Sequence, residues 1–425
     1  MEIKQDVQQH NLAENQNQQS KIFCTAPFFH YYYKGSRFKS RMLPCCESRM
    51  PDMPRQSFEE YWRSDFLKDV RQSMLDGKKH DICTRCIDVE TNGGFSARKH
   101  YNNIVGKLEK LIDNKLEYSV ETGTQYDTPL AIDYRGSNLC NLKCRMCHPG
   151  SSSEIAKEII KHQNKYESFG FGDAKYGLYK DNKEPNKFIE TLPLENIRRM
   201  KILGGEPLMQ EDVYIALEKI KKFPHAKDVL ISFTTNATNF PERFINLVGQ
   251  YKKFLLRVSL DGVGDVYEYV RTNGNWKQVL DNCININTHG FTPDQIGLGF
   301  SFVIQFYNIF SIKEILTFCA EWENKQYKIW DMPIFFSTIE QDHLSTLMLT
   351  DEDRNFVNDQ INEFDEEYPN KEYTQVIREI VNNFDINRKI HKKTALKLMK
   401  DYTLMQDKLR KTDLTSLNQR YKKYL

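Results

Sequence analysis

The sequence has no excess of charge of one sign. Its 60 Lys and Arg residues are nearly balanced by 58 Asp and Glu residues, which leaves a formal net charge of +2 over 425 residues. A nearly neutral chain offers no electrostatic reason to expect binding to nucleic acid or to an acidic membrane surface. We therefore expect neither partner.

Long apolar runs are absent as well. No segment reaches the roughly 18 consecutive apolar residues that a membrane-spanning helix needs. Residues 1–20 are polar and rich in Gln and Asn, lack the apolar stretch of a signal peptide, and predict a disordered tail. Together these features predict a cytoplasmic protein with no membrane partner.

Cysteine, by contrast, is abundant. Ten cysteines in a chain with no expected export signal indicate a reducing compartment and metal binding, not a disulfide framework. Eight of them lie between Cys24 and Cys147. The other two, Cys283 and Cys319, fall within apolar helical patterns and are expected to be small, buried hydrophobic residues.

Three of the cysteines form a compact motif. Cys140, Cys144 and Cys147 have the spacing C-x3-C-x2-C, with Met146 directly before the last cysteine. Three thiolates on one tight loop suit an iron–sulfur cluster, and a four-iron cluster held by only three of them keeps an open iron for a small ligand. The alternative is a zinc site, since His148 follows Cys147 and would complete a Cys3His set. The spacing favours the cluster, because zinc sites prefer paired C-x2-C knuckles.

From Pro129 onward, short β-rich runs alternate with helical patterns, which predicts a parallel α/β architecture. The helix after the cysteine motif is expected to begin at Ser151, capped by that residue, and a helical extension capped by Thr350 follows the last strand. Two further helices are predicted at 276–287 and 312–323. The predicted strands are 130–135, 200–203, 229–235, 254–260, 296–304 and 334–338.

Polar motifs stand at the ends of these strands. The second strand runs into Gly204-Gly205-Glu206-Pro207, the third ends in Thr235-Asn236-Ala237, and the fourth ends in Ser259-Leu260-Asp261-Gly262. Each motif alone would read as an ordinary turn. Active sites of barrels gather at the C-terminal ends of the strands, so we expect these motifs to lie beside the cysteine loop.

The cysteine loop and the motifs after it resemble the radical S-adenosylmethionine (SAM) superfamily. The resemblance implies a partial (β/α)6 TIM-like barrel and a 4Fe-4S cluster on Cys140, Cys144 and Cys147 whose open iron binds SAM. It further implies reductive cleavage of SAM to a 5′-deoxyadenosyl radical that abstracts hydrogen from a substrate. A flavodoxin- or ferredoxin-type electron donor is implied as a partner.

The resemblance also assigns residues to the SAM site. Gly204, Gly205, Glu206 and Pro207 match the GGEP motif, whose glycines let the backbone approach SAM and whose backbone and carboxylate accept from its ammonium group. Asn236 lies in a TNG-like segment in which Ala237 replaces the glycine.

Downstream residues are assigned in the same way. Ser259 and Asp261 match polar residues near the SAM ribose, and Arg271 matches an arginine that pairs with the SAM carboxylate. Met146 is assigned to the same cofactor site. Val303, Gln305 and Asn308, at the end of the fifth strand, are candidates for contacts with adenine or substrate.

A second cysteine set precedes the core. It comprises Cys24, the pair Cys45-Cys46, and Cys83-x2-Cys86, and its surroundings resemble the SPASM or twitch modules that carry auxiliary iron–sulfur clusters. An auxiliary 4Fe-4S cluster needs four thiolates, so Cys24, Cys83 and Cys86 would be joined by Cys45 or Cys46, and we favour Cys45. A zinc ribbon is the alternative for this region.

These patterns divide the chain into a disordered polar tail (1–20), an auxiliary cluster module (21–125), a radical SAM core (126–345) and a helical extension (346–425). In the extension, an acidic segment at 351–367 and the basic residues after 386 are expected to pair with each other. The expected substrate is a peptide or protein side chain. One alternative is dehydrogenation of a small metabolite such as an amino sugar, and another is a non-catalytic zinc-binding interaction protein.

Overall fold

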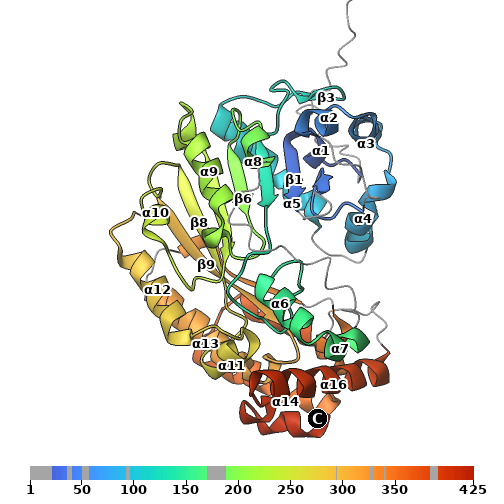
Figure 1. Ribbon diagram of the computed structural model, residues 1–425, viewed down its shortest axis with the longest axis vertical. Helices are drawn as coiled ribbons and strands as arrows, with labels where there is room; N and C mark the ends of the chain where they lie inside the picture. Colours follow the sequence, from blue (N-terminus) through green and yellow to red (C-terminus); the bar gives the residue numbers. More distant parts are fainter. Residues whose placement is uncertain are drawn as a thin grey trace, which may run out of the picture.

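The computed structural model describes residues 22–35, 41–49, 57–91, 96–169, 188–292, 294–325, 329–338, 341–382 and 391–425. The predicted tail at 1–20 lies outside this range. The main feature is an eight-stranded sheet in the order β10-β9-β8-β7-β6-β5-β1-β2 (Figure 1). Seven neighbouring strands are parallel, and β2 pairs antiparallel at the edge. The predicted α/β fold with a partial TIM-like barrel is therefore confirmed.

All six predicted strands are present in the sheet. They are β5 (Ala131–Arg135), β6 (Arg199–Ile202), β7 (Leu230–Thr235), β8 (Lys253–Ser259), β9 (Ile296–Ile304) and β10 (Ile329–Thr338). Along β6, β7 and β8, fully buried residues alternate with half-buried ones, as expected for a strand whose two faces differ. The buried set, which includes Met200, Ile231 and Phe254, belongs to the main hydrophobic core.

Helices α9 (Glu211–Ile220), α12 (Trp276–Thr288) and α13 (Ile312–Asn324) contribute their apolar faces to the same core, which confirms the two predicted helices. Helix α6 (Ser153–Lys161) begins later than predicted. Its cap is Ser152, whose hydroxyl accepts from Ile155 N, because Ser151 belongs to the preceding turn and donates its N–H to His148 O. The shorter helices are α7 (Gln163–Tyr166), α8 (Phe188–Thr191), α10 (Glu242–Ile245) and α11 (Asp265–Val270).

The N-terminal region joins the same sheet. Strand β1 (His30–Lys34) pairs in parallel with β5, from His30 opposite Ala131 to Lys34 opposite Arg135, and β2 (Arg41–Leu43) pairs with β1. Helices α1 (Ala26–Phe29), α2 (Phe58–Trp62), α3 (Asp65–Leu75), α4 (Thr84–Thr91) and α5 (Ala97–Ile112) lie together at this end of the molecule (Figure 1), with the short strands β3 (Tyr118–Ser119) and β4 (Gly123–Thr124). The sequence did not predict that β1 extends the core sheet.

The C-terminal extension comprises α14 (Asp351–Glu367), α15 (Tyr373–Asn382) and α16 (Lys392–Arg410). Thr350 caps α14 as predicted. The acidic start of α14 pairs with the basic tail, since Asp353 contacts Arg420 at 2.9 Å and Lys423 at 2.7 Å, which confirms the expected pairing. Helix α16 lies beside α6 and α7 (Figure 1), where Tyr402 packs with apolar residues of both.

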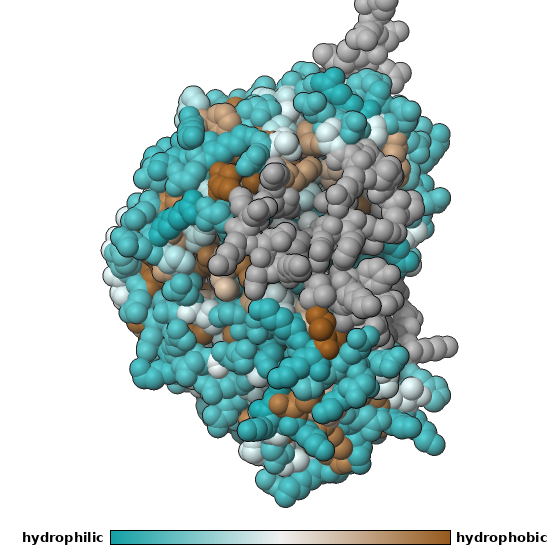
Figure 2. All heavy atoms as spheres, viewed as in Figure 1, coloured by the Kyte–Doolittle hydropathy of each residue, from teal (hydrophilic) through white to brown (hydrophobic). Residues whose placement is uncertain are grey.

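The surface shown in Figure 2 is mostly hydrophilic, with hydrophobic side chains in small separate groups. Four large apolar side chains in the described residues are more than 40% exposed: Ile160, Met209, Val376 and Leu404. No helix within the described ranges is both long and apolar enough to cross a membrane.

Candidate active site

The cysteine loop lies between β5 and α6, and its three thiols gather in one place. Cys140 and Cys144 are buried and form a small cluster with Leu142, against which Met146 and Cys147 pack. The first turn of α6 holds the loop, since the Ser152 hydroxyl donates to Leu142 O at 2.7 Å and the Ser153 hydroxyl donates to Cys140 O at 3.0 Å. The loop conformation therefore brings the predicted thiols together.

The glycine motif after β6 packs directly onto this loop. Gly205 has φ +51°, and a Cβ atom there would lie 2.2 Å from Leu139 O, the carbonyl immediately before Cys140. Glu206 N donates to the same carbonyl at 2.7 Å. Only glycine allows this approach, so the motif fixes the start of the cysteine loop. Pro207 follows as the first residue of a short 3-10 turn in which Pro207 and Leu208 are buried.

The Glu206 carboxylate links the ends of β6 and β7. It accepts from the Thr235 hydroxyl at 2.7 Å, from Asn236 N at 2.6 Å and from Leu208 N at 3.2 Å. Burial raises the pKa of Glu206 to about 7, even though these donors lower it. A carboxylate held here is placed to accept from a cationic ligand group beside the cysteine loop.

Asn236, at the end of β7, contacts the cysteine loop directly. Its side-chain amide donates to Asn141 Oδ1 at 2.8 Å and contacts Cys140 Sγ at 3.9 Å. Ala237 has φ +54°, the left-handed conformation for which glycine is favoured, and is fully buried. The alanine therefore adopts the backbone shape of the glycine that it replaces.

Asp261 and Arg271 connect β8 and β9 to the loop. Asp261 pairs with Arg271 Nη2 at 2.6 Å and accepts from Val303 N at 2.7 Å, so both carboxylate oxygens are engaged. Arg271 also donates to Leu260 O at 3.2 Å and contacts Cys144 Sγ at 3.7 Å. This geometry brings a guanidinium charge to one of the three thiols.

The remaining predicted residues lie at the same strand ends. Asn308 is buried and donates to Asp261 O at 2.9 Å, while Ser259 is the half-buried last residue of β8. Gln305 is buried, and within the described part of the chain its Oε1 atom has no hydrogen-bond partner. An unsatisfied buried acceptor at a strand end suits a donor group on a bound ligand.

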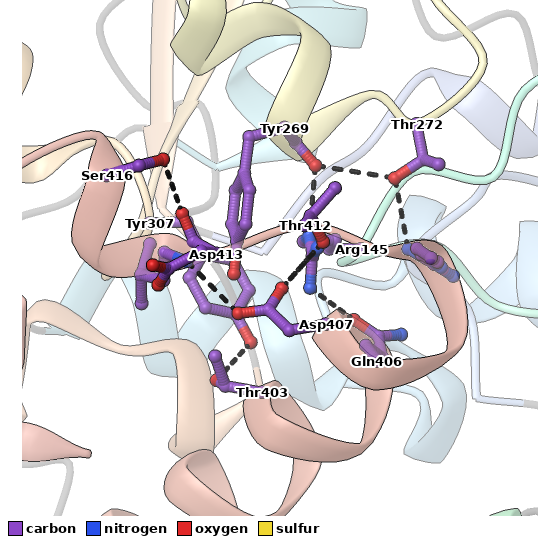
Figure 3. A network of polar contacts seen from close by, with 12 residues as sticks. Arg145, Tyr269, Thr272, Tyr307, Thr403, Gln406, Asp407, Thr412, Asp413 and Ser416 are labelled. Carbon is purple, nitrogen blue, oxygen red and sulfur yellow. Dashed lines mark hydrogen bonds and ion pairs between the residues drawn. The ribbon is translucent and has the colours of Figure 1, made fainter.

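The sequence did not predict that the C-terminal extension holds the cysteine loop. Arg145, between Cys144 and Cys147, is fully buried by residues of α16 and the chain after it (Figure 3). It donates to Asp407 Oδ1 at 2.7 Å, to Thr412 Oγ1 at 2.6 Å and to Tyr269 O at 2.9 Å. Its guanidinium carbon lies 3.6 Å from the centre of the Tyr269 ring.

A second arginine of α16 strengthens this attachment. Arg410 donates to Lys143 O in the cysteine loop at 3.1 Å and pairs with Glu158 of α6 at 2.7 Å. Burial favours a higher pKa for Glu158, but Arg410, Tyr166 and Lys143 outweigh burial and lower the pKa to about 2. We call the contacts of Arg145 and Arg410 with the loop and α6 the C-terminal brace.

The second cysteine set lines one cavity in the N-terminal region. Cys24, Cys45, Cys83 and Cys86 all face it, together with Tyr101 and other residues. Cys46 is not among the lining residues and is exposed. Among the residues that the structure describes, neither these thiols nor those of the cysteine loop are arranged as a preformed group of three metal ligands. Four thiols thus line one cavity. Of the two adjacent cysteines, Cys45 lines it and Cys46 does not.

The comparison with protein families fits the strand-end geometry. Residues 134–319, from β5 to α13, match the family described as the radical SAM superfamily. These residues form a radical SAM domain. Radical SAM domains bind a 4Fe-4S cluster and SAM, and the three gathered thiols, the close-packed glycine turn and the unsatisfied Gln305 acceptor fit those groups.

Curated relatives match about the same segment. GTP 3′,8-cyclase of Petrotoga mobilis is 23% identical over 172 residues, covering 39% of this chain and 46% of the relative. A probable GTP 3′,8-cyclase of Methanocaldococcus jannaschii is 26% identical, covering 44% and 53%, and the Trichodesmium erythraeum enzyme is 28% identical, covering 39% and 47%. The chain thus spans about half the length of the curated relatives that it matches.

Solved structures show only distant likeness. SuiB of Streptococcus suis bound to S-adenosylmethionine has a TM-score of 0.32 at 14% identity, with 79% of this chain and 68% of SuiB covered. TYW1 with a lysine–pyruvate adduct has a TM-score of 0.29 at 15% identity, with 56% and 73% covered. Scores this low carry no argument about the radical SAM domain or its substrate.

Proposed function

We propose that the chain reductively cleaves SAM at a 4Fe-4S cluster held by Cys140, Cys144 and Cys147. The observation that carries this proposal is the convergence of these thiols with the motifs that end β6, β7 and β8, within the segment that matches the superfamily. When bound, the cluster and SAM supply a 5′-deoxyadenosyl radical that removes a hydrogen atom from the substrate.

The residues around the loop have distinct proposed roles. Gly204, Gly205 and Glu206 would receive the amino group of SAM, since a buried carboxylate lies there directly after two glycines. Arg271 is proposed to bind the SAM carboxylate, for which it would exchange a present contact with Leu260 O or Cys144 Sγ. In its present position it also places positive charge beside the Cys144 thiolate.

The test is the cleavage of SAM by anaerobically reconstituted protein reduced with dithionite. The variant with Cys140, Cys144 and Cys147 all replaced by Ala should produce no 5′-deoxyadenosine. A matched control replaces Cys283 and Cys319, which are buried in α12 and α13, by Ala and should retain cleavage. Full turnover by the triple variant would refute the proposed function.

We propose a second 4Fe-4S cluster in the N-terminal cavity, held by Cys24, Cys45, Cys83 and Cys86. All four thiols line the same cavity, and the charges of Cys83 and Cys86 each raise the pKa of Cys24, after the larger effect of burial. The triple variant that lacks the core thiolates should then stay brown and keep roughly half the iron, because each cluster holds four irons. A colourless variant with one zinc would instead mark a zinc ribbon.

We propose that the substrate is a small molecule. We prefer this to the peptide side chain that the sequence predicted. The curated relatives are named for a reaction on GTP, whereas the likeness to SuiB, which binds a precursor peptide, has a TM-score of 0.31. The electron donor is proposed to be a flavodoxin or ferredoxin. Ten free cysteines suit a reducing cytoplasm as the place of action.

A further inference from the structure

The two faces of the core sheet differ in chemistry. On β6, Met200 and Ile202 face the apolar core, while the alternate residues Arg199 and Lys201 are half-buried on the opposite face. Strand β8 repeats the pattern, with half-buried Arg257 between Leu256 and Val258 of the core. Side chains alternate along a strand, so these basic residues share one face of the sheet.

The same face continues onto β5 and β1. We define the basic face as the Lys and Arg side chains that alternate with core residues on β1, β5, β6 and β8: Lys34, Arg135, Arg199, Lys201, Lys253 and Arg257. On these four strands its one acidic residue is Asp133, which contacts His30 at 3.2 Å, Arg199 at 3.2 Å and Lys201 at 3.9 Å. Of the six basic residues, Arg199 and Lys201 contact this carboxylate.

The basic face reaches the cysteine loop. Lys34 and Arg135 are the last residues of β1 and β5 and lie opposite each other, and the cysteine loop follows Arg135. A Cβ atom at Gly204 would lie 2.3 Å from Arg135 Cγ. The Arg135 side chain therefore packs against the glycine turn. Lys201 and Arg257 lie in the C-terminal halves of their strands. Lys34, Arg135, Lys201 and Arg257 thus lie toward the C-terminal ends of their strands. Active sites of barrels lie on this side of the sheet.

The electrostatics of the region agree with this placement. Burial lowers the pKa of Arg257, and the neighbouring Arg199 lowers it further. His100 of α5 has a pKa lowered to about 4, first by burial and then by Arg199 and Lys201. Burial is the larger cause in both cases, and the neighbouring positive charges add to it.

We propose that the basic face binds the phosphate groups of a small anionic substrate and holds that substrate beside the cysteine loop. This inference rests on the proposed function, since it names the substrate class for the same site. Several Lys and Arg side chains around one carboxylate match an anion with more than one charge, and arginine forks fit phosphate oxygens.

The experiment measures binding of three probes to the anaerobically reconstituted full chain by calorimetry in the presence of SAM. The probes are GTP, inorganic tripolyphosphate and guanosine. GTP and tripolyphosphate are expected to bind and guanosine is not, because the phosphates carry the recognition. Lys201→Gln and Arg257→Gln should each weaken tripolyphosphate binding about tenfold, as expected for loss of one charge-assisted contact.

The matched control is Lys222→Gln, which removes the same charge from an exposed residue just after α9. It should leave tripolyphosphate binding unchanged. Circular dichroism reports whether each variant folds, and if Arg257→Gln does not fold, the half-buried Lys201→Gln carries the test.

Three results would overturn the phosphate assignment: equal binding of guanosine and GTP, equal tripolyphosphate binding by Lys201→Gln and wild type, or displacement of tripolyphosphate by an equimolar hexaglutamate peptide. The last would indicate an acidic peptide substrate. SAM cleavage by dithionite-reduced protein without any probe is measured separately. Cleavage without phosphate binding contradicts only this inference, whereas phosphate binding without cleavage contradicts only the proposed function.

Discussion

Gly205 shows how much of the site depends on a single missing side chain. Its φ of +51° disfavours residues other than glycine, and a Cβ atom there would clash with Leu139 O. Gly264 offers a comparison, because it has a φ of +56° but no heavy atom within 4 Å of a built Cβ. A substitution at Gly264 therefore adds backbone strain alone, whereas one at Gly205 adds strain and a steric clash.

We predict that Gly264→Ala costs about 1–3 kcal/mol of unfolding free energy, because its φ of 56° and ψ of −129° lie in a region that residues with a Cβ atom rarely adopt. Gly205→Ala should cost more and should also lower the iron bound after reconstitution, because the clash displaces the residue before Cys140. Urea unfolding and iron analysis of both variants measure this. Equal iron content in the two variants would contradict the proposed link between the glycine turn and the cysteine loop.

The adjacent cysteines Cys45 and Cys46 allow a sharp test of the N-terminal site. Cys45 lines the cavity with Cys24, Cys83 and Cys86, whereas Cys46 is exposed outside it. In protein that lacks the core thiolates, Cys45→Ser should lose most of the remaining iron, and Cys46→Ser should keep it. The opposite order of iron contents would show that Cys46 is the ligand.

For single residues, the sequence predicts which residues belong to the site better than it predicts which residues they contact. The spacing of Cys140, Cys144 and Cys147 was sufficient to expect one loop, because their separation is local. The choice between Cys45 and Cys46 was open, since it depends on which side of the backbone faces Cys83. The partners of Arg145 in α16 and in the chain after it lie 261 to 267 residues away and leave no local pattern.

At the scale of elements, α6 and α16 are joined by a buried ion pair. The side chains of Glu158 and Arg410 are 8% and 1% exposed, so their interaction is little screened by solvent. The folded protein lowers the pKa of Glu158 from 4.5 to about 2. A carboxyl group with a lowered pKa contributes stability above its unfolded pKa, and the contribution is lost as the pH falls.

We predict that Glu158→Gln reduces the unfolding free energy of the apoprotein by about 3 kcal/mol near neutral pH. The difference from wild type should shrink as the pH falls from 4.5 toward 2, because wild-type Glu158 is then protonated as well. Urea titrations across that window measure the difference. Glu154→Gln, which removes a half-buried carboxylate from the same helix, should show no such trend. A constant difference would argue against the ion pair as its cause.

The six core strands were predictable because each is a short segment with β-branched or aromatic residues, and these segments alternate with helical patterns. Strand β1 was not, although its sequence, His30-Tyr31-Tyr32-Tyr33-Lys34, is rich in aromatic residues. Its partner β5 lies about a hundred residues later, and parallel pairing at that distance has no sequence signature. The basic face follows from the alternation of apolar and basic residues in β6 and β8, which is visible in the sequence.

At the scale of the whole molecule, pairing of β1 with β5 makes the N-terminal region part of the barrel. Tyr33 stacks on Tyr134 of β5 with ring centres 5.4 Å apart and on Phe188 at 4.2 Å. Both Tyr33 and Tyr134 belong to the main core. The two regions are therefore expected to lose structure together.

We predict that Tyr33→Ala costs about 3–4 kcal/mol, as for other large aromatic residues removed from cores. Hydrogen exchange should accelerate at both 30–34 and 131–135. Tyr368→Ala, which removes a half-buried ring from the end of α14, should leave exchange in these strands unchanged. Acceleration confined to β1 would show instead that the N-terminal region opens independently of the core.

The C-terminal brace also bears on how the protein is made. Ribosomes add residues at about 5–20 per second, and Asp407 follows Arg145 by 262 positions, so the cysteine loop waits roughly 13–50 s for its partner. During translation the guanidinium of Arg145 and the carbonyl of Lys143 lack the contacts that α16 later provides. If iron reached the nascent chain, the cysteine loop would not yet be held by the C-terminal brace. We therefore expect the cluster to be inserted after α16 has been synthesised.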